Sequence, residues 1–84
     1  MLTQRDRSAL NKQIEDMYRQ RALNLALAME HAGGWAQLGR LCGQSADFLK
    51  QLASSRPQRR VGEHLARKIE FDLGVPKGWL DEKH

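Results

Sequence analysis

The stretch that decides the fold of this chain covers residues 35–52 and reads WAQLGRLCGQSADFLKQL. A glycine, Gly43, interrupts it, and on either side apolar residues recur at the three- and four-residue spacing of a helix that buries one face. Before the glycine these residues are Leu38, Leu41 and Cys42, and after it they are Leu49 and Leu52. The stretch therefore predicts two short helices, over 35–42 and from 45 to 53 or 54, joined by a tight turn.

The turn between these two helices has the residue types that close packing requires. Gly39 gives the first helix a small position where the second crosses it, and Gly43 tolerates the positive φ of a tight turn. Ser45 can cap the second helix, and Asp47 in its first turn suits the helix dipole. This combination is typical of a helix-turn-helix.

The residues before this stretch form one long amphipathic segment. Ser8 can cap its start, and Gly33 can end it in a left-handed conformation. At about 100° per residue one stripe holds Leu10, Ile14, Met17, Tyr18, Ala22, Leu25, Ala28, Met29 and Ala32. We predict a continuous helix, with a break near 19–21 as the alternative. Arg21 is the one charge inside the stripe, and Leu23 and Leu27 form a pair on the opposite face.

The residues after the stretch predict a loop and one more long helix. Proline and polar residues over 54–60 indicate the loop. The helix, 62–73, ends at Gly74 and buries Val61, Leu65, Ala66, Ile69 and Leu73. Phe71 projects away from that stripe, while Trp79 and Leu80 fold back to close the core. No segment alternates as a strand does, so the predicted fold class is all-α: a compact bundle of four or five helices with an extended first helix.

Composition narrows the classes of function. The net charge of +4, with a pI of about 9.7, suits an anionic partner. No apolar run approaches the ~20 residues of a membrane span, and the N-terminus lacks the apolar segment of a signal peptide. One cysteine, Cys42, excludes a disulfide within the chain and fits a reducing cytoplasm, where we expect the protein. Its place on the inner face favours a buried small hydrophobe over a redox sensor.

Catalytic and metal-binding patterns are absent from the sequence. His31, His64 and His84 are scattered without metal-ligand spacing. No serine has a histidine and a carboxylate arranged for nucleophilic catalysis, and no glycine-rich phosphate loop follows a strand. We therefore expect no enzyme activity, no metal, no cofactor and no small-molecule substrate.

Residues 38–52 resemble the helix-turn-helix of the lambda-repressor-like family of phage repressors, Cro proteins and related bacterial regulators. Residues 60–70, RVGEHLARKIE, look like the fourth helix of those domains, and 73–81, LGVPKGWLD, look like the tail that follows it. The resemblance covers about 25–81. The chain departs from the family at Trp35, where glutamine is frequent, and at Gln44, where an apolar residue is usual. Together with the long amphipathic segment, it predicts three parts: a helical extension over 1–20 continuous with the first helix, a DNA-binding domain over 21–81 and a tail over 82–84.

The resemblance also implies a site: the helix after the turn enters the major groove of double-stranded DNA. The residues expected to read bases are Gln44, Ser45, Ala46, Asp47, Lys50 and Gln51. Those expected to contact phosphates are Trp35, Ser54, Arg56, Arg59 and Arg60. Asp47 has the alternative role of a helix cap, and Arg56 has that of reaching a base edge or the minor groove.

Small repressor domains bind two half-sites as dimers, so we expect a homodimer. One candidate surface is Leu10, Ile14 and Met17, and the other is Leu23, Leu27 and Phe71. The alternative is that the extension packs on its own domain. The expected function is a sequence-specific transcriptional regulator, a phage or prophage repressor. The alternatives are an antitoxin-type regulator, a protein-interaction module with this fold, and the DNA-binding half of a longer self-cleaving repressor.

Overall fold

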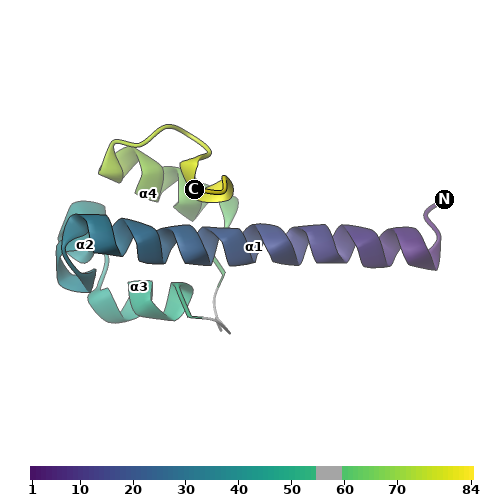
Figure 1. The fold of residues 1–84 in the computed structure, drawn as a ribbon, viewed down its shortest axis with the longest axis horizontal. Helices are drawn as coiled ribbons and strands as arrows, with labels where there is room; N and C mark the ends of the chain where they lie inside the picture. The colour runs from purple at the N-terminus through teal and green to yellow at the C-terminus, as the bar shows by residue number, and fades with distance from the viewer. Residues whose placement is uncertain (55–59) are drawn as a thin grey trace.

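The structure of the chain is a computed structural model that describes residues 1–54 and 60–84. It is all-helical over those residues, with four α-helices and one short 3₁₀-helix (Figure 1). The elements are α1 (Gln4–Ala32), α2 (Trp35–Cys42), α3 (Ala46–Leu52), α4 (Glu63–Leu73) and η1 (Trp79–Asp81). The predicted all-α fold is confirmed, and α1 continues through 19–21 without the alternative break.

The start of α1 corrects one sequence prediction. Thr3 caps the helix, and its hydroxyl oxygen accepts a hydrogen bond from the Asp6 backbone N–H at 3.1 Å. The Asp6 carboxylate in turn accepts from the Thr3 backbone N–H at 3.1 Å, which completes a capping box. Ser8 therefore lies inside the helix, and its predicted role as the cap is wrong. The other end of α1 is at Gly33, as predicted, with φ of 94°.

The core lies beside the C-terminal half of α1. In Figure 1, α3 and α4 lie on opposite sides of this half, and α2 crosses its end. The buried cluster is Leu25, Ala28, Leu38, Cys42, Leu49, Leu52, Val61, Ala66, Ile69 and Leu80. Most of these residues were predicted to face inward. Each helix thus contributes one apolar stripe, and the return of the chain after α4 adds Leu80 from η1.

Leu41 is an exception to this agreement. The sequence placed it on the inner face of α2 with Leu38 and Cys42, yet it is exposed. Gly39 is buried beside those two residues, so α2 is rotated to bring its glycine inward. That rotation turns Leu41 outward, because Leu41 and Gly39 lie on opposite sides of Leu38 around the helix.

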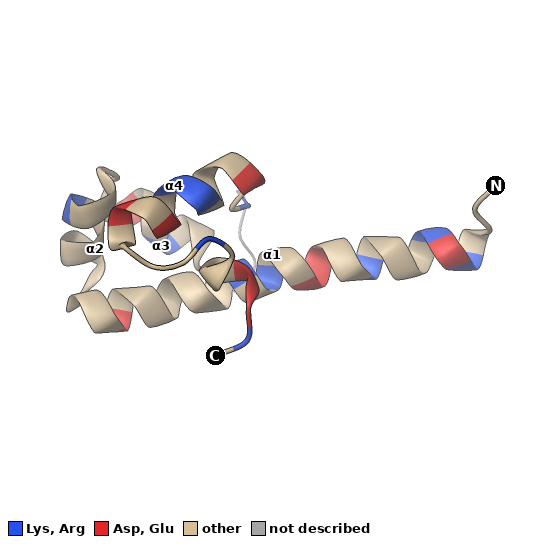
Figure 2. Cartoon of the chain, turned by 90° about the horizontal axis from the view of Figure 1, so that it is seen from above, with Lys and Arg blue, Asp and Glu red and all other residues tan. Residues whose placement is uncertain are grey.

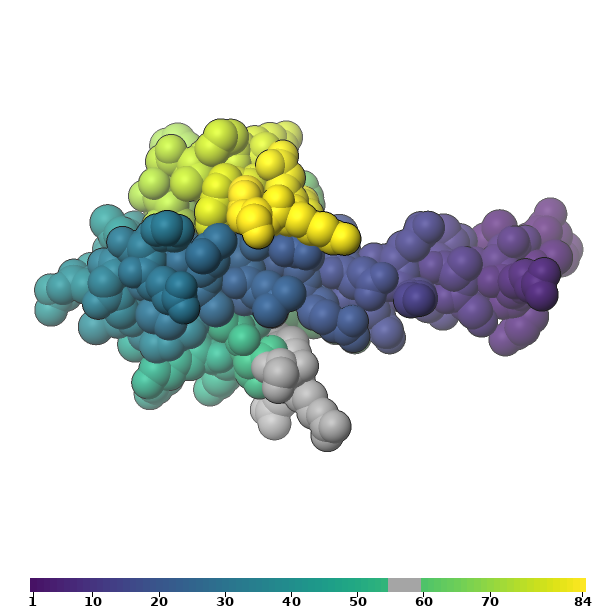
Figure 3. All heavy atoms as spheres, viewed as in Figure 1, coloured from purple at the N-terminus to yellow at the C-terminus, as the bar shows by residue number. Residues whose placement is uncertain are grey.

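The N-terminal half of α1 stands clear of the rest of the molecule (Figures 1 and 3). All residues from 1 to 16 are exposed, including Leu10 at 43% and Ile14 at 47%. The molecule is correspondingly elongated, with extents of 46 × 25 × 21 Å. The alternative that this extension packs on its own domain is therefore wrong for residues 1–16, because burial of the α1 stripe begins at the half-buried Met17.

Among residues 1–54 and 60–84, no helix combines the length and the apolar composition that crossing a bilayer requires.

Candidate nucleic-acid interface

Two glycines set the geometry of the turn between α2 and α3. Gly43 ends α2 with φ of 66° and ψ of 31°, in the left-handed region that the sequence predicted for it. The next residue, Gln44, donates its backbone N–H to the Gly39 carbonyl at 3.0 Å. A Cβ atom on Gly39 would lie 2.5 Å from the Gln44 backbone oxygen. Only a residue without a side chain fits there, so the predicted small position is confirmed.

The α3 helix buries one side and exposes the other. Ser45 caps it, and its hydroxyl oxygen accepts from the Phe48 N–H at 3.1 Å. Leu49 and Leu52 are fully buried beneath the helix. Lys50 and Gln51 are exposed on its outer face. Asp47 and Ser45 are also exposed, whereas Gln44 and Ala46 are half-buried. The six residues predicted to read bases thus lie together on α3 and its N-terminal approach, most of them open to solvent.

A lysine of α4 supports the turn from behind. The Lys68 ammonium donates to the Cys42 carbonyl oxygen at 2.9 Å and pairs with Asp72 at 2.6 Å. The Cys42 carbonyl is at the C-terminal end of α2, where a positive charge is favourable. Sequence reasoning missed this contact. The i, i+4 spacing of Lys68 and Asp72 indicated that these two side chains could pair. It gave no indication that Lys68 also reaches the Cys42 carbonyl.

Three of the residues predicted to contact phosphates lie in the described part of the chain, each on a different segment. Trp35 begins α2 and is half-buried against the core, and Ser54 is exposed just after α3. The Arg60 guanidinium lies 5.0 Å from the centroid of the Tyr18 ring, a cation–π contact with α1. Arg56 and Arg59 fall outside the described residues. Basic and acidic residues are interspersed along α1 and α4, so charge is mixed over the described surface (Figure 2).

Cys42 is buried in the core, and burial raises the pKa of its thiol. A thiol held protonated in an apolar setting is a poor nucleophile, which agrees with the predicted packing role. Over residues 1–54 and 60–84, no group of histidine, cysteine and acidic side chains could hold a metal ion.

A buried arginine joins the start of the domain to its end. Arg21 is 1% exposed, and its Nε donates to Asp81 in η1. Its Nη1 donates to the Val61 carbonyl oxygen at 2.7 Å, and its Nη2 donates to Glu63 at 2.8 Å. Arg67 adds a second bond to Asp81 at 2.6 Å. The sequence marked Arg21 as the one charge inside the α1 stripe but gave it no role.

Two further buried polar side chains fix the segment that returns after α4. The Asn24 amide donates to the Leu80 carbonyl at 2.8 Å and to the Glu82 carbonyl at 2.6 Å. The Glu70 carboxylate accepts from the backbone N–H groups of Gly78 and Leu80 at 2.9 and 2.8 Å. Sequence reasoning missed both roles, because helical periodicity shows which residues face inward but not which loop atoms they meet.

The Asp81 carboxylate makes the fold sensitive to acid. The hydrogen bond from Arg21 is the main cause that holds the pKa of Asp81 below its ordinary value. Such a group stabilises the fold above its unfolded pKa, and the stabilisation is lost as pH falls through the folded pKa. We expect the free energy of unfolding to decline as pH drops below about 4, and to decline less in Asp81→Asn. Urea unfolding at a series of pH values measures how the free energy of unfolding changes with pH in the original protein and in Asp81→Asn.

The control for this prediction is Glu15→Gln, the same loss of a carboxylate at an exposed position in the middle of α1. In this variant the free energy of unfolding should fall with pH as steeply as in the original protein. A slope that is unchanged in Asp81→Asn would contradict the assignment.

Comparison with known proteins adds one partial likeness. The chain matches imidazoleglycerol-phosphate dehydratases of Neisseria meningitidis serogroup B and Neisseria gonorrhoeae, at 37% identity over 68 residues in each case. The match covers 71% of this chain but spans only 22% of the length of these curated relatives. No family model and no solved structure matches the chain.

Proposed function

We propose that this chain is a sequence-specific DNA-binding protein of the lambda-repressor-like type that acts in the cytoplasm as a transcriptional regulator. The observation that carries the proposal is the unit formed by α2, its left-handed Gly43 and α3. In this unit Leu49 and Leu52 are buried while Lys50 and Gln51 are exposed on the outer face. The major groove of DNA admits an α-helix presented in this way.

The exposed side chains of α3 have the chemistry that base reading requires. Gln51 can bond an adenine edge with its amide, and Lys50 can reach a guanine or a phosphate. Asp47 can accept from cytosine, and Ala46 can touch a thymine methyl group. Because Ser45 caps α3 by accepting a hydrogen bond, its own hydroxyl proton remains free to donate to DNA.

Contacts to the phosphate backbone would add affinity and register. Arg60 is exposed next to the start of α4, whose N-cap Gly62 makes no side-chain capping bond. The uncapped N–H groups at that end can also bind a phosphate. Glu63 adjoins them, but its carboxylate is partly neutralised by Arg21 and Arg67. Trp35, Ser54, Arg56 and Arg59 keep their proposed phosphate roles.

One observation favours a second candidate function. The neisserial dehydratases contain a similar segment that makes up 22% of their length, so a segment of this type also occurs within enzymes. A protein-interaction module that has the same fold but binds no DNA would account for the presence of such a segment in an enzyme. The two candidates differ in whether the chain binds DNA.

Selection of binding sites from random duplex DNA, followed by titration over a salt series, tests the proposal. On the selected site Gln51→Ala should lower affinity by about 1–3 kcal/mol and relax the sequence preference. Arg60→Ala should weaken binding to all sequences alike and reduce the salt slope by about one. The two effects differ because base contacts carry sequence information and phosphate contacts do not.

The matched control is Gln4→Ala, the same change at the exposed start of α1, which should leave both affinity and preference unchanged. If no sequence is enriched and random DNA binds without salt dependence, the proposal is wrong and the protein-interaction module replaces it.

A further inference from the structure

The ring of Tyr18 on α1 contacts two arginine side chains. The Arg60 guanidinium lies 5.0 Å from the centroid of this ring, and the Arg21 guanidinium lies 5.7 Å from it. Both distances are within the reach of a cation–π attraction, which extends to about 6 Å. Tyr18 is half-buried and Arg60 is exposed. The ring therefore joins α1 to an exposed side chain that is proposed to contact a phosphate.

The backbone beside Arg60 is held by α1 independently of this ring. Val61 is 1% exposed, and its carbonyl oxygen accepts a hydrogen bond from Arg21 Nη1 at 2.7 Å. Glu63, the first residue of α4, accepts from Nη2 of the same arginine at 2.8 Å. Arg21 thus fixes the chain over 61–63, and what the Tyr18 ring adds is a restraint on the side chain of Arg60.

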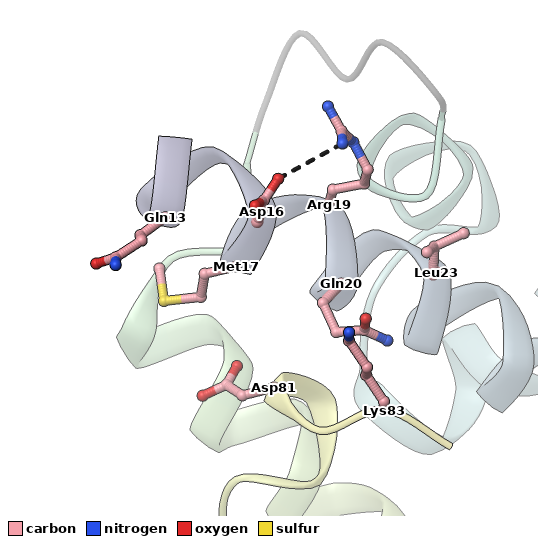
Figure 4. A pocket seen from close by; sticks show the side chains of 8 residues that line it. All are labelled: Gln13, Asp16, Met17, Arg19, Gln20, Leu23, Asp81 and Lys83. Carbon is pink, nitrogen blue, oxygen red and sulfur yellow. Dashed lines mark ion pairs between the residues drawn. The ribbon is translucent and has the colours of Figure 1, made fainter. Parts of the chain in front are cut away.

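The kind of partner distinguishes Arg60 from the two arginines of α1 nearest to it in this part of the fold. Arg21 is buried and donates to two carboxylates and a carbonyl oxygen. Arg19, which lines the shallow groove of Figure 4, pairs with Asp16 at 3.6 Å. Arg60 lies against an aromatic ring, which attracts a cation without neutralising its charge. The charge of Arg60 therefore stays available to a phosphate.

We propose that Tyr18 is a positioning residue, which holds the Arg60 side chain in place for a phosphate before DNA binds. A long side chain that becomes immobile on binding loses rotamer freedom, and this loss lowers affinity. A ring that restrains the side chain in the free protein removes part of that cost. The role rests on the proposed function, because it requires that Arg60 contacts DNA. Tyr18 precedes residues 25–81, so the resemblance to the repressor family does not supply the role.

Titration of the full chain with a random-sequence DNA duplex over a salt series tests the role. Tyr18→Leu should lower the affinity about 2- to 10-fold, the cost of ordering one long side chain on binding. The slope of log affinity against log salt concentration should stay unchanged, because the complex keeps the phosphate contact. Tyr18→Phe retains a ring, so its affinity should stay within about twofold of the original.

Tyr18→Leu in the Arg60→Ala background separates positioning from a general loss of stability. Once Arg60 is absent, Tyr18→Leu should lower the affinity no further, whereas damage to the fold would lower it in both backgrounds. Thermal unfolding checks that each variant is folded at the temperature of the titration. An equal loss in both backgrounds, or a loss in Tyr18→Phe as large as in Tyr18→Leu, would overturn the role.

Nuclear magnetic resonance of the protein without DNA tests the contact itself. The Tyr18 ring current should shift the side-chain signals of Arg60, and this shift should disappear in Tyr18→Leu and persist in Tyr18→Phe. If the original protein binds DNA and Tyr18→Leu binds it equally well, the role is wrong and the proposed function stands. If the shift is present but the original protein binds no DNA, the proposed function fails, and the role fails with it.

Discussion

Replacing Arg21 by leucine should lower the free energy of unfolding by about 3 kcal/mol, the low end of the cost of breaking a buried ion pair. The guanidinium is 1% exposed and joins three elements through Asp81, Val61 and Glu63. Its loss leaves the buried Val61 carbonyl without this donor, and such groups cost about 1–3 kcal/mol when unsatisfied. The low end applies because Glu63 is largely exposed and Asp81 keeps its bond to Arg67.

Arg19→Leu is the control for this prediction, since it makes the same change two residues earlier on the same helix. The Arg19 side chain is 70% exposed, and it pairs with Asp16 at 3.6 Å. Exposed pairs of this kind contribute about 0–1 kcal/mol, so the stability should barely change. Urea unfolding of the three proteins gives the comparison. A loss of less than about 1 kcal/mol in Arg21→Leu would mean that Arg67 alone can hold Asp81 and Glu63.

Arg21 also shows where sequence reasoning about the fold ends. Periodicity predicted that this residue lies on the inner face of a long helix, and it does. The same periodicity contains no information about Asp81, which is 60 residues away and meets Arg21 only once the chain returns after α4. Local patterns thus predicted the helices, their glycine ends and most of the core. Partners that depend on tertiary contacts, such as those of Asn24 and Glu70, had no local signature.

The candidate site was predictable to the same extent. The outward face of α3 follows from the burial of Leu49 and Leu52, and that local pattern was readable. The placement of Arg60 beside Tyr18 was not, because it depends on how the chain passes α1 after α3. Leu41 shows a further limit, since a helix of eight residues leaves the rotation of its apolar face poorly determined. Close approach at Gly39 decided that rotation.

Replacing Gly39 by alanine should lower the free energy of unfolding by about 2 kcal/mol, within the usual cost of overpacking. In an ordinary helix interior the same change is favourable by about 0.5–1 kcal/mol. Here the sign reverses because the added Cβ would lie 2.5 Å from the Gln44 backbone oxygen, and a backbone atom cannot move aside as a side-chain end can. Relief requires α3 to shift away from α2. If the chain binds DNA as proposed, this shift of α3 should also lower the affinity for DNA.

Gly62→Ala separates this clash from the general effect of adding a methyl group. Gly62 has φ of −69°, and a Cβ there would meet nothing within 4 Å. The only cost of Gly62→Ala is that alanine caps a helix less well than glycine, so the free energy of unfolding should fall by about 1 kcal/mol or less. Thermal or urea unfolding compares the two variants, and heteronuclear NMR shifts along α3 report whether the helix moves. If Gly39→Ala were as stable as the original protein, the two helices would not approach as closely as this turn requires. The exposed face of α3 would then lose the support that positions Lys50 and Gln51 together.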